Sequence, residues 1–202
     1  MNIVCLDLEG VLVPEIWIDF ADLTGIDALR ATTRDIADYD ELMRMRLAEL
    51  ERHGLGLPDI EAVISRMAPL AGALEFLEAL RARYQVVILS DTFYEFARPL
   101  MRQLKWPTLF CHTLETAADG RISGYRLRLP DHKRAAVNAF RDLAFTVVAA
   151  GDSYNDTGML GAAHQGVLFN APDNVIADFP QFPVVTGYAG LAEAIDSGLA
   201  RA

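Results

Sequence analysis

Short, continuous apolar runs alternate with amphipathic segments along most of this chain. The runs have the length and composition of buried strands, and they lie at residues 2–8, 85–92, 107–112, 145–153, 166–170 and 183–186. Apolar residues recur at helical spacing in residues 72–84, 93–104, 131–143, 155–164 and 191–200. Within the second of these helices, we expect Pro99 to start or kink a segment. Apolar strands that alternate with helices predict an α/β fold with a doubly wound parallel sheet.

Two segments depart from this alternation. Residues 15–69 read as helical almost throughout, and they are too long for one crossover helix. We therefore interpret them as a small helical cap inserted after the first strand, with residues 1–14 and 70–202 as the core domain. Residues 111–129 alternate in polarity around Asp119-Gly120, and this pattern predicts a β-hairpin.

Polar residues collect where three of the predicted strands end. The first run leads into Asp7 and Glu9, the second into Ser90, Asp91 and Thr92, and the fourth into Asp152, Asn155 and Asp156. Lys133 stands near the start of the helix that precedes the fourth run. Because ligands of open α/β sheets gather outside the carboxyl ends of the strands, we expect these side chains to converge on one crevice.

The residue types in this set fit phosphoryl transfer. Crowded carboxylates repel one another and therefore call for a cation, and oxygen ligands without His or Cys partners favour Mg²⁺. A serine hydroxyl, nearby backbone N–H groups and a lysine suit the oxygens of a phosphoryl group in flight. A carboxylate in such a site can attack phosphorus, and a second acid two residues on can serve as general acid and base.

Four short motifs in this order resemble those of the haloacid dehalogenase-like phosphatases: "DLEGV", the serine of "ILSDT", Lys133 and "GDSYND". Each motif is weak alone, but together they span nearly the whole chain. The resemblance implies a Rossmann-like core of the haloacid dehalogenase type. It also implies that Asp7 is the nucleophile, that Glu9 is the acid/base, and that Mg²⁺ is held by Asp7, the backbone carbonyl of Glu9, and Asp152.

The same resemblance assigns the remaining strand-end residues. Ser90 and Lys133, with Asp91 and Thr92 beside the serine, would bind the phosphoryl group. Asn155 would contact the substrate. Asp156 would support the site; the alternative is that it does no more than orient Lys133 and the loop.

Within this family the chain looks most like the phosphoserine phosphatases. More narrowly, it resembles a short branch described as bifunctional phosphoserine phosphatase and phosphoserine:homoserine phosphotransferase. The stretches that carry this likeness are "CLDLEGVLVPEIW", "ATTRDI", "VVILSDTFYEF", "AAGDSYNDT" and "FPQFP". The chain departs from common phosphoserine phosphatases at Glu9, where they have Asp, and at Asp91 and Thr92, where they have glycines. These departures favour the narrower branch, with homoserine as a second phosphoryl acceptor.

Arg46 lies on the apolar side of the helix expected at residues 40–52. It is four residues after Leu42, three after Met43 and four before Leu50, so it shares their face. A guanidinium group there needs an anion, which either an acid of the cap or a substrate carboxylate could supply. The family resemblance favours the substrate carboxylate. By the same resemblance, Glu15 would bind the substrate ammonium group, although an acid at a helix start is also favoured by the helix dipole.

Composition narrows the partners. The chain has 202 residues, is 52% hydrophobic and carries a net charge of −10. An acidic surface disfavours nucleic acids and anionic membranes, and no apolar stretch approaches the ~20 residues that span a bilayer. Two cysteines in apolar runs, Cys5 and Cys111, suggest buried thiols in a reducing compartment, so we expect a cytoplasmic protein. The sequence leaves the oligomeric state open; a homodimer is the assembly we consider.

Several residues have no functional assignment from the sequence. The four histidines, His53, His112, His132 and His164, show no metal-ligand spacing, and we expect surface or capping roles for them. Trp17 and Trp106 are expected to be packing residues.

Three other functions compete with phosphoserine turnover. A signalling receiver domain also combines acids, a hydroxyl residue and a lysine at strand ends, but it lacks a long helical insert. A dehalogenase needs no acid two residues after its nucleophile. A phosphatase for another small phosphorylated metabolite would share the core chemistry and differ in the cap pocket.

Overall fold

The central strand, β1 (Asn2–Leu6), lies in a mostly parallel sheet. The computed structural model describes residues 1–32, 35–36 and 39–201, so residues 33 and 34 of "ATTRDI" lie outside the described part. Within that part, seven strands form one sheet in the order β4-β3-β2-β1-β5-β6-β7. The other strands are β2 (Gln85–Phe93), β3 (Thr108–Thr116), β4 (Ile122–Arg126), β5 (Thr146–Gly151), β6 (Gln165–Phe169) and β7 (Val184–Val185).

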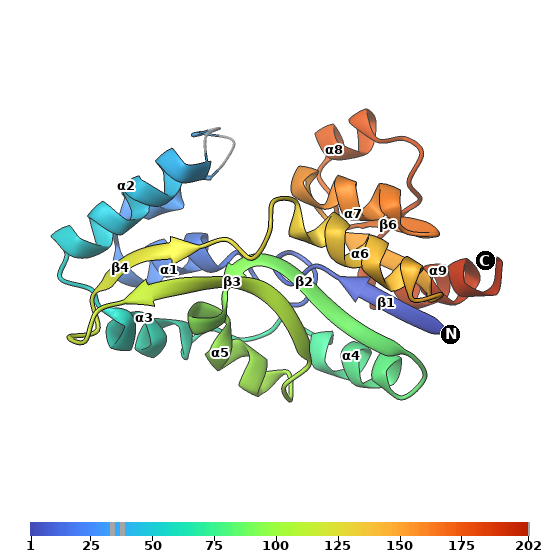
Figure 1. Ribbon diagram of the computed structural model, residues 1–202, viewed down its shortest axis with the longest axis horizontal. Coiled ribbons are helices and arrows are strands. Elements are labelled where there is room, and N and C mark those ends of the chain that lie inside the picture. Colours follow the sequence, from blue (N-terminus) through green and yellow to red (C-terminus); the bar gives the residue numbers. More distant parts are fainter. Residues whose placement is uncertain (33–34, 37–38, 202) are drawn as a thin grey trace.

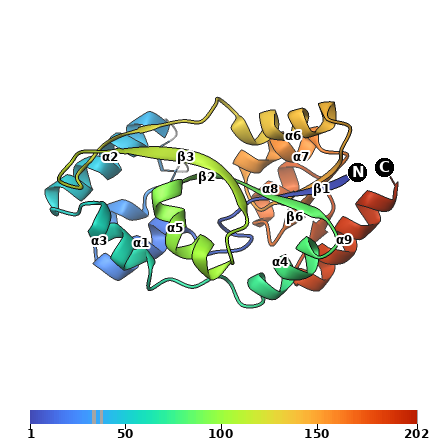
Figure 2. The same cartoon turned by 60° about the horizontal axis from the view of Figure 1, so that its bottom comes forward.

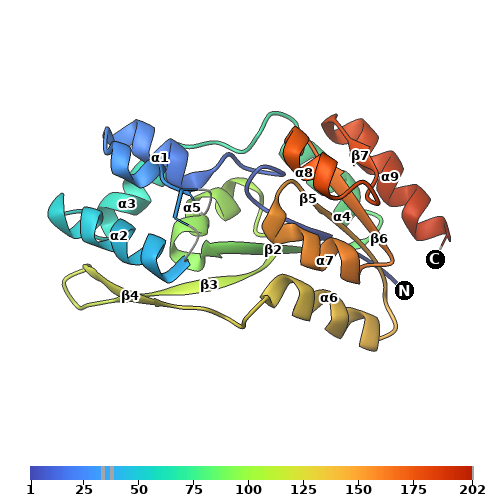
Figure 3. The same cartoon turned by 90° about the horizontal axis from the view of Figure 1, so that it is seen from above.

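Helices cover both faces of this sheet, as expected for a doubly wound fold (Figure 1). One face packs against α4 (Ala73–Arg81), α5 (Tyr94–Gln103) and α9 (Gly187–Arg201). Figure 2 shows α4 and α9 side by side. The opposite face packs against α6 (His132–Asp142) and α7 (Thr157–Ala162), which lie together in Figure 3. The short helices η2 (Tyr154–Asp156) and α8 (Asp173–Asp178) complete this side.

The segment after β1 folds into the predicted helical region. It contains α1 (Ile16–Thr24), η1 (Asp27–Arg30), α2 (Tyr39–Arg52) and α3 (Leu57–Ile64). In Figure 1 these helices lie at the end of the molecule away from α9. Helix α3 packs on α5 of the core, and α2 contacts β4 of the β3–β4 hairpin. The hairpin thus supports the cap as well as extending the sheet.

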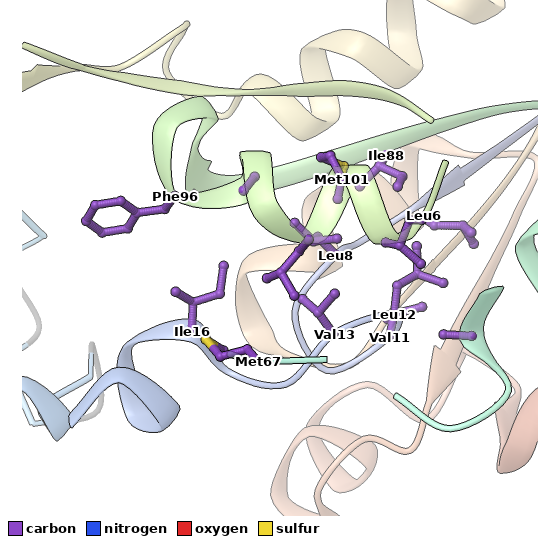
Figure 4. Close-up of a cluster of buried hydrophobic side chains, with 14 of the residues drawn as sticks. Leu6, Leu8, Val11, Leu12, Val13, Ile16, Met67, Ile88, Phe96 and Met101 are labelled. Atoms are coloured by element: carbon purple, nitrogen blue, oxygen red, sulfur yellow. The ribbon is translucent and has the colours of Figure 1, made fainter. Parts of the chain in front are cut away.

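Apolar side chains anchor the loop that follows β1. Figure 4 shows Leu8, Val11, Leu12 and Val13 turned into the core near Ile88 and Met101. All of these side chains are buried. Backbone bonds close the loop, with the Leu12 and Val13 N–H groups donating to the Leu8 carbonyl at 2.8 and 3.0 Å. Burial of the apolar residues therefore fixes the intervening acids.

Some sequence expectations need correction. The "PTLFCH" run is the start of a nine-residue strand, because β3 pairs in parallel with β2 and then continues into the antiparallel hairpin with β4. The strand before "GDSYND" is therefore the fifth in the chain. Helix α8 was not expected. Pro99 does not start a helix, since α5 runs through it, and burial of its apolar face outweighs one lost backbone hydrogen bond.

No helix among the described residues combines the length and the apolar character needed to cross a membrane.

Candidate active site

The strand order reverses between β1 and β5. From β1 the chain moves outward through β2 and β3, and from β5 it moves the other way through β6 and β7. Such a reversal opens a crevice at the carboxyl ends of the two central strands. Asp7 directly follows β1, and Asp152 directly follows β5. The two carboxylates are therefore neighbours because of topology, although they are far apart in sequence.

Gly10 lets the loop after β1 approach Asp152 closely. Its φ is +74°, in the left-handed region, and a Cβ at this position would lie 2.5 Å from Asp152 Oδ2. Only glycine avoids both the strain of a left-handed backbone and the clash with Asp152. The second acid of the loop, Glu9, is thereby held on the wall of the same crevice.

Three carboxylates and one lysine form the buried centre of the site. Oxygen atoms of Asp7, Asp152 and Asp156 all lie within 4.8 Å of one another. The Lys133 ammonium group donates to Asp7 Oδ1 at 2.9 Å and to Asp156 Oδ1 at 2.8 Å. Burial, followed by the charge of Asp156, raises the pKa of Asp7 well above its usual value and that of Asp152 to about 7. The single positive charge of Lys133 does not neutralise the negative charges of three carboxylates.

Asp156 is committed to structural contacts. It is fully buried, and its Oδ2 accepts the Asp152 and Ser153 backbone N–H groups at 3.0 and 3.1 Å. Its other oxygen accepts from Lys133. Asp7 and Asp152 are thus the carboxylates of this group with capacity for a cation.

This donor set fits a hard divalent cation. Mg²⁺ takes oxygen ligands and usually binds one or two carboxylates while keeping several waters. The crowding of Asp7 and Asp152 leaves an excess of negative charge that such a cation would neutralise. Because the ligands are oxygens and carry excess negative charge, the site suits a metal ion.

Ser90 and its neighbours form an irregular segment at the end of β2. Pairing between β2 and β3 shifts register between Leu89 and Phe93, and residues 90–92 lie in that gap. The Ser90 hydroxyl is buried and accepts the Thr92 N–H at 3.3 Å. The Asp91 carboxylate turns toward Lys133 Nζ, at 3.2 Å, and accepts from Asn155 Nδ2 at 2.6 Å.

Glu9 faces Glu15 at the start of the cap. Glu9 Oε2 accepts the Ile16 N–H at 3.1 Å, and its carboxyl group faces Glu15, the N-cap residue of α1. Burial, followed by the charge of Glu15, raises the pKa of Glu9 to about 8. Glu9 is therefore able to hold a proton at neutral pH, as a general acid requires.

Arg46 lies where its helical spacing predicts. Its side chain is buried, with the guanidinium group 4.4 Å from the centre of the Trp17 ring and Nη2 donating to the Ala31 carbonyl at 2.8 Å. A cation stacked on an indole ring is stabilised by the ring quadrupole. Leu42, Met43 and Leu50 are buried on the same face of α2, as expected.

One cavity of about 560 Å³ joins these groups. Every predicted site residue except Asp156 lines it: Asp7, Glu9, Glu15, Arg46, Ser90, Asp91, Thr92, Lys133, Asp152 and Asn155. Asp156 lies buried beneath Lys133. The cavity thus runs from the strand ends to the cap.

Two histidines of the cavity were missed. His112 and His132 are buried, and their Nε2 atoms lie 3.5 and 3.1 Å from Asp91 Oδ1. The expectation of surface or capping roles is wrong for both, because β3 and α6 converge beside Asp91. The position of His132 next to Lys133, in the first turn of a helix aimed at the crevice, was the available signal.

The two tryptophans have different environments. Trp17 is buried, as expected of a packing residue, and it also stacks on Arg46. Trp106 is 60% exposed, so its expected packing role is wrong. It lies in the turn after α5, where its φ of 53° is left-handed.

Comparisons with known proteins show the family of this chain. A family model described as haloacid dehalogenase-like hydrolase matches residues 8–161. Phosphoserine phosphatase ThrH of Pseudomonas aeruginosa is 64% identical over 191 residues, which cover 95% of this chain and 93% of that protein. A phosphoserine phosphatase of Pseudomonas syringae pv. tomato is 64% identical over 185 residues, covering 92% of this chain and 78% of that protein.

Solved structures share the fold. The crystal structure of a phosphoserine phosphatase in apo form has a TM-score of 0.75 at 20% identity, covering 96% of this chain and 98% of that one. A phospho-aspartyl intermediate analogue of phosphoserine phosphatase also has a TM-score of 0.75, at 19% identity, covering 97% of this chain and 98% of that one. At these identities the likeness concerns the fold alone. The family match and the two close relatives show that the chain belongs to the haloacid dehalogenase-like hydrolases.

Proposed function

We propose that this protein hydrolyses O-phosphoserine to serine and phosphate through a phosphorylated Asp7. The observation that carries this proposal is one cavity with Asp7, Lys133 and Ser90 at one end and Glu15 and Arg46 at the other. The first group suits a phosphoryl group, and the second suits the two charges of an α-amino acid. The two relatives at 64% identity, both named phosphoserine phosphatase, support the same substrate.

The cap end would select the amino acid. Arg46 would bind the substrate carboxylate through two parallel hydrogen bonds, and stacking on Trp17 would hold its guanidinium group flat. Glu15 would bind the ammonium group. The distinction from other small phosphates rests on this pair, because the strand-end groups contact only the phosphoryl end.

The strand-end groups would carry the chemistry. Asp7 attacks phosphorus with a carboxylate oxygen, while Lys133 and the Ser90 hydroxyl bind the phosphoryl oxygens. Glu9, which holds its proton at neutral pH, donates it to the serine oxygen that leaves. The resulting Glu9 carboxylate then removes a proton from the water that attacks the aspartyl-phosphate.

Other residues would support this centre. Asp7, Asp152 and the backbone carbonyl of Glu9 would hold Mg²⁺, which supplies positive charge for the phosphoryl oxygens. Thr92 and the backbone N–H groups of residues 90–92 would contribute to phosphate binding. Because the Asp91 carboxylate is itself an anion, its share in phosphate binding would come from its backbone. Asn155 would contact the substrate from η2, and Asp156 would orient Lys133.

A second acceptor would be homoserine, an alcohol that carries the same α-amino acid group as serine. Glu15 and Arg46 would bind it as they bind serine, and its hydroxyl would replace water. The longer reach of Glu9, compared with Asp, would weaken water activation and let the alcohol compete.

Cys5 and Cys111 are buried free thiols, which agrees with a cytoplasmic location. A homodimer stays a prediction.

The test is an assay of the purified protein with O-phosphoserine and Mg²⁺, with and without homoserine. Free phosphate and phosphohomoserine are both counted. We expect phosphate release that requires Mg²⁺, and phosphohomoserine when homoserine is present. No turnover of phosphoserine, with rapid turnover of a phosphate lacking an amino group, would reject the substrate assignment.

A further inference from the structure

Asp91 brings a carboxylate directly after Ser90, beside the nucleophile. Among the described residues it contacts side chains of three other elements. Oδ1 lies near His112 Nε2 of β3 and His132 Nε2 of α6, whereas Oδ2 lies near Lys133 Nζ of α6 and Asn155 Nδ2 of η2. We call this group the Asp91 cluster: Asp91, His112, His132, Lys133 and Asn155. It lines the cavity beside the nucleophile.

The two histidines act as donors in this cluster. The Arg128 N–H donates to His112 Nδ1 at 3.2 Å, so that nitrogen carries the lone pair and the proton of a neutral ring is on Nε2. The Nε2 proton then faces Asp91 Oδ1 at 3.5 Å. A metal held by Asp91, His112 and His132 would instead need lone pairs on both Nε2 atoms, and it would face the Lys133 ammonium group close by. The geometry therefore indicates a carboxylate held by hydrogen bonds, with both histidines as positioning residues.

Lys133 has more carboxylate partners than a phosphate-binding lysine can keep. Its Nζ lies 2.9 Å from Asp7, 2.8 Å from Asp156 and 3.2 Å from Asp91, and an ammonium group has three protons. To bind a phosphoryl oxygen, it must release one of them. Asp156 is fixed by two backbone N–H groups, and Asp7 is the attacking group. Asp91 has the longest contact and keeps other donors when Lys133 turns away.

The negative charge of Asp91 makes it a competitor for Lys133 when a phosphoryl group binds. Burial alone would raise the pKa of Asp91, but the charge of Lys133 and hydrogen bonds from His112, His132 and Asn155 lower it well below its usual value. Asp91 is therefore an anion at neutral pH, beside the expected position of another anion. A carboxylate there repels phosphate and competes with it for the same ammonium group.

We propose that Asp91 is a built-in competitor of phosphate for Lys133, which holds the lysine in the free enzyme, weakens the binding of inorganic phosphate and speeds its release. The inference rests on the proposed function, because it requires that Lys133 bind the phosphoryl group. His112 and His132 draw the Asp91 charge toward Oδ1. Without their N–H groups, Asp91 would hold Lys133 more tightly.

The test is calorimetric titration of inorganic phosphate into the protein with Mg²⁺, with thermal unfolding as a check that each variant folds. Asp91→Asn keeps the shape of the side chain, and Asp91→Ser shortens it. For both we expect the dissociation constant to fall by roughly three- to tenfold, since one nearby like charge is removed. His132→Asn removes the Nε2 donor, and we expect weaker binding. His132→Gln keeps an N–H donor near that position and should match the wild type.

The Asp91 variants should bind phosphate more tightly and His132→Asn should bind it more weakly. These opposite changes separate competition from a structural role. If Asp91→Asn and Asp91→Ser bind phosphate no more tightly than the wild type, Asp91 is not a competitor and the inference is overturned. Zn²⁺ bound by the metal-free wild type but not by His132→Asn would also overturn it, in favour of a metal site. A wild type that neither binds phosphate nor hydrolyses phosphoserine rejects the proposed function as well. A wild type that does both, with unchanged Asp91 variants, rejects this inference alone.

Discussion

The ammonium group of Lys133 lies 2.9 Å from Oδ1 of Asp7, and both side chains are buried. The two residues are 126 positions apart and meet because Lys133 stands in the first turn of α6, at the edge of the sheet where β1 ends. Burial lowers the pKa of Lys133, but the charges of Asp156, Asp7 and Asp91 outweigh it and raise the pKa well above its usual value. Lys133 therefore stays charged and holds Asp7 in place.

Removal of this lysine charge should destabilise the fold. Lys133→Met leaves buried carboxylates without their counter-charge, and we expect a loss of roughly 3–5 kcal/mol in the free energy of unfolding. Urea unfolding of the metal-free protein measures it. Lys105→Met is the matched control, because Lys105 pairs with Glu78 at the surface, where an ion pair is worth about 0–1 kcal/mol. Equal losses in the two variants would contradict the account.

Arg46 should decide substrate choice. Arg46→Ala removes two charge-assisted hydrogen bonds to the substrate carboxylate, each worth about 1.5–3 kcal/mol, so kcat/KM for phosphoserine should fall by ~10²-fold or more. Turnover of an aryl phosphate, which has no such carboxylate, should change little. The matched control is Arg44→Ala on the exposed face of α2. Equal losses on both substrates would show that Arg46 acts on the fold instead.

The choice between water and homoserine as phosphoryl acceptor should depend on the length of the side chain at position 9. Glu9 Oε2 reaches the Ile16 N–H at 3.1 Å, and an Asp at this position is too short to keep that contact. Glu9→Asp should therefore shift the acid toward the water position and lower the ratio of phosphohomoserine to free phosphate. A misplacement of about 1 Å can change a rate by ~10²-fold, so the effect should be measurable. A ratio that stays constant or rises contradicts this role of Glu9.

Mg²⁺ should stabilise the protein more at high pH than at low pH. The folded pKa of Asp152 is about 7, against an ordinary value of 3.8, so between these values the folded state binds more protons than the unfolded state. The stability of the metal-free protein therefore falls as pH rises through that window. A bound cation offsets the charge, so the rise in Tm on adding Mg²⁺ should be larger at about pH 8 than at about pH 5.

Thermal unfolding in chelator and in excess Mg²⁺ tests this pH dependence. In Asp152→Asn the gain should be small at both pH values. A wild-type gain that is the same at both would argue against a cation at Asp7 and Asp152.

Much of this site could be predicted from local pattern. Asp7 and Asp152 end continuous apolar runs, and parallel strands bring such ends to one edge. Arg46 could be placed because helical periodicity puts it on the face of Leu42 and Leu50, which is buried.

The two histidines of the Asp91 cluster could not be predicted in this way. His112 reaches Asp91 because it pairs with Phe93 just after the register shift between β2 and β3, and the apolar pattern does not encode where that shift occurs. His132 reaches it because the linker from β4 sets the position of α6. Both contacts depend on how elements dock, whereas the strand-end acids depend only on where strands stop.

The most direct test of the central claim is the location of the transferred phosphoryl group. The wild type is mixed with phosphoserine and Mg²⁺, quenched in acid and digested, and the peptides are weighed. The account predicts that a peptide with Asp7 gains the mass of one phosphoryl group and that Asp7→Asn neither gains it nor releases phosphate. Phosphate release by Asp7→Asn at the wild-type rate, or the added mass on another residue, would contradict it.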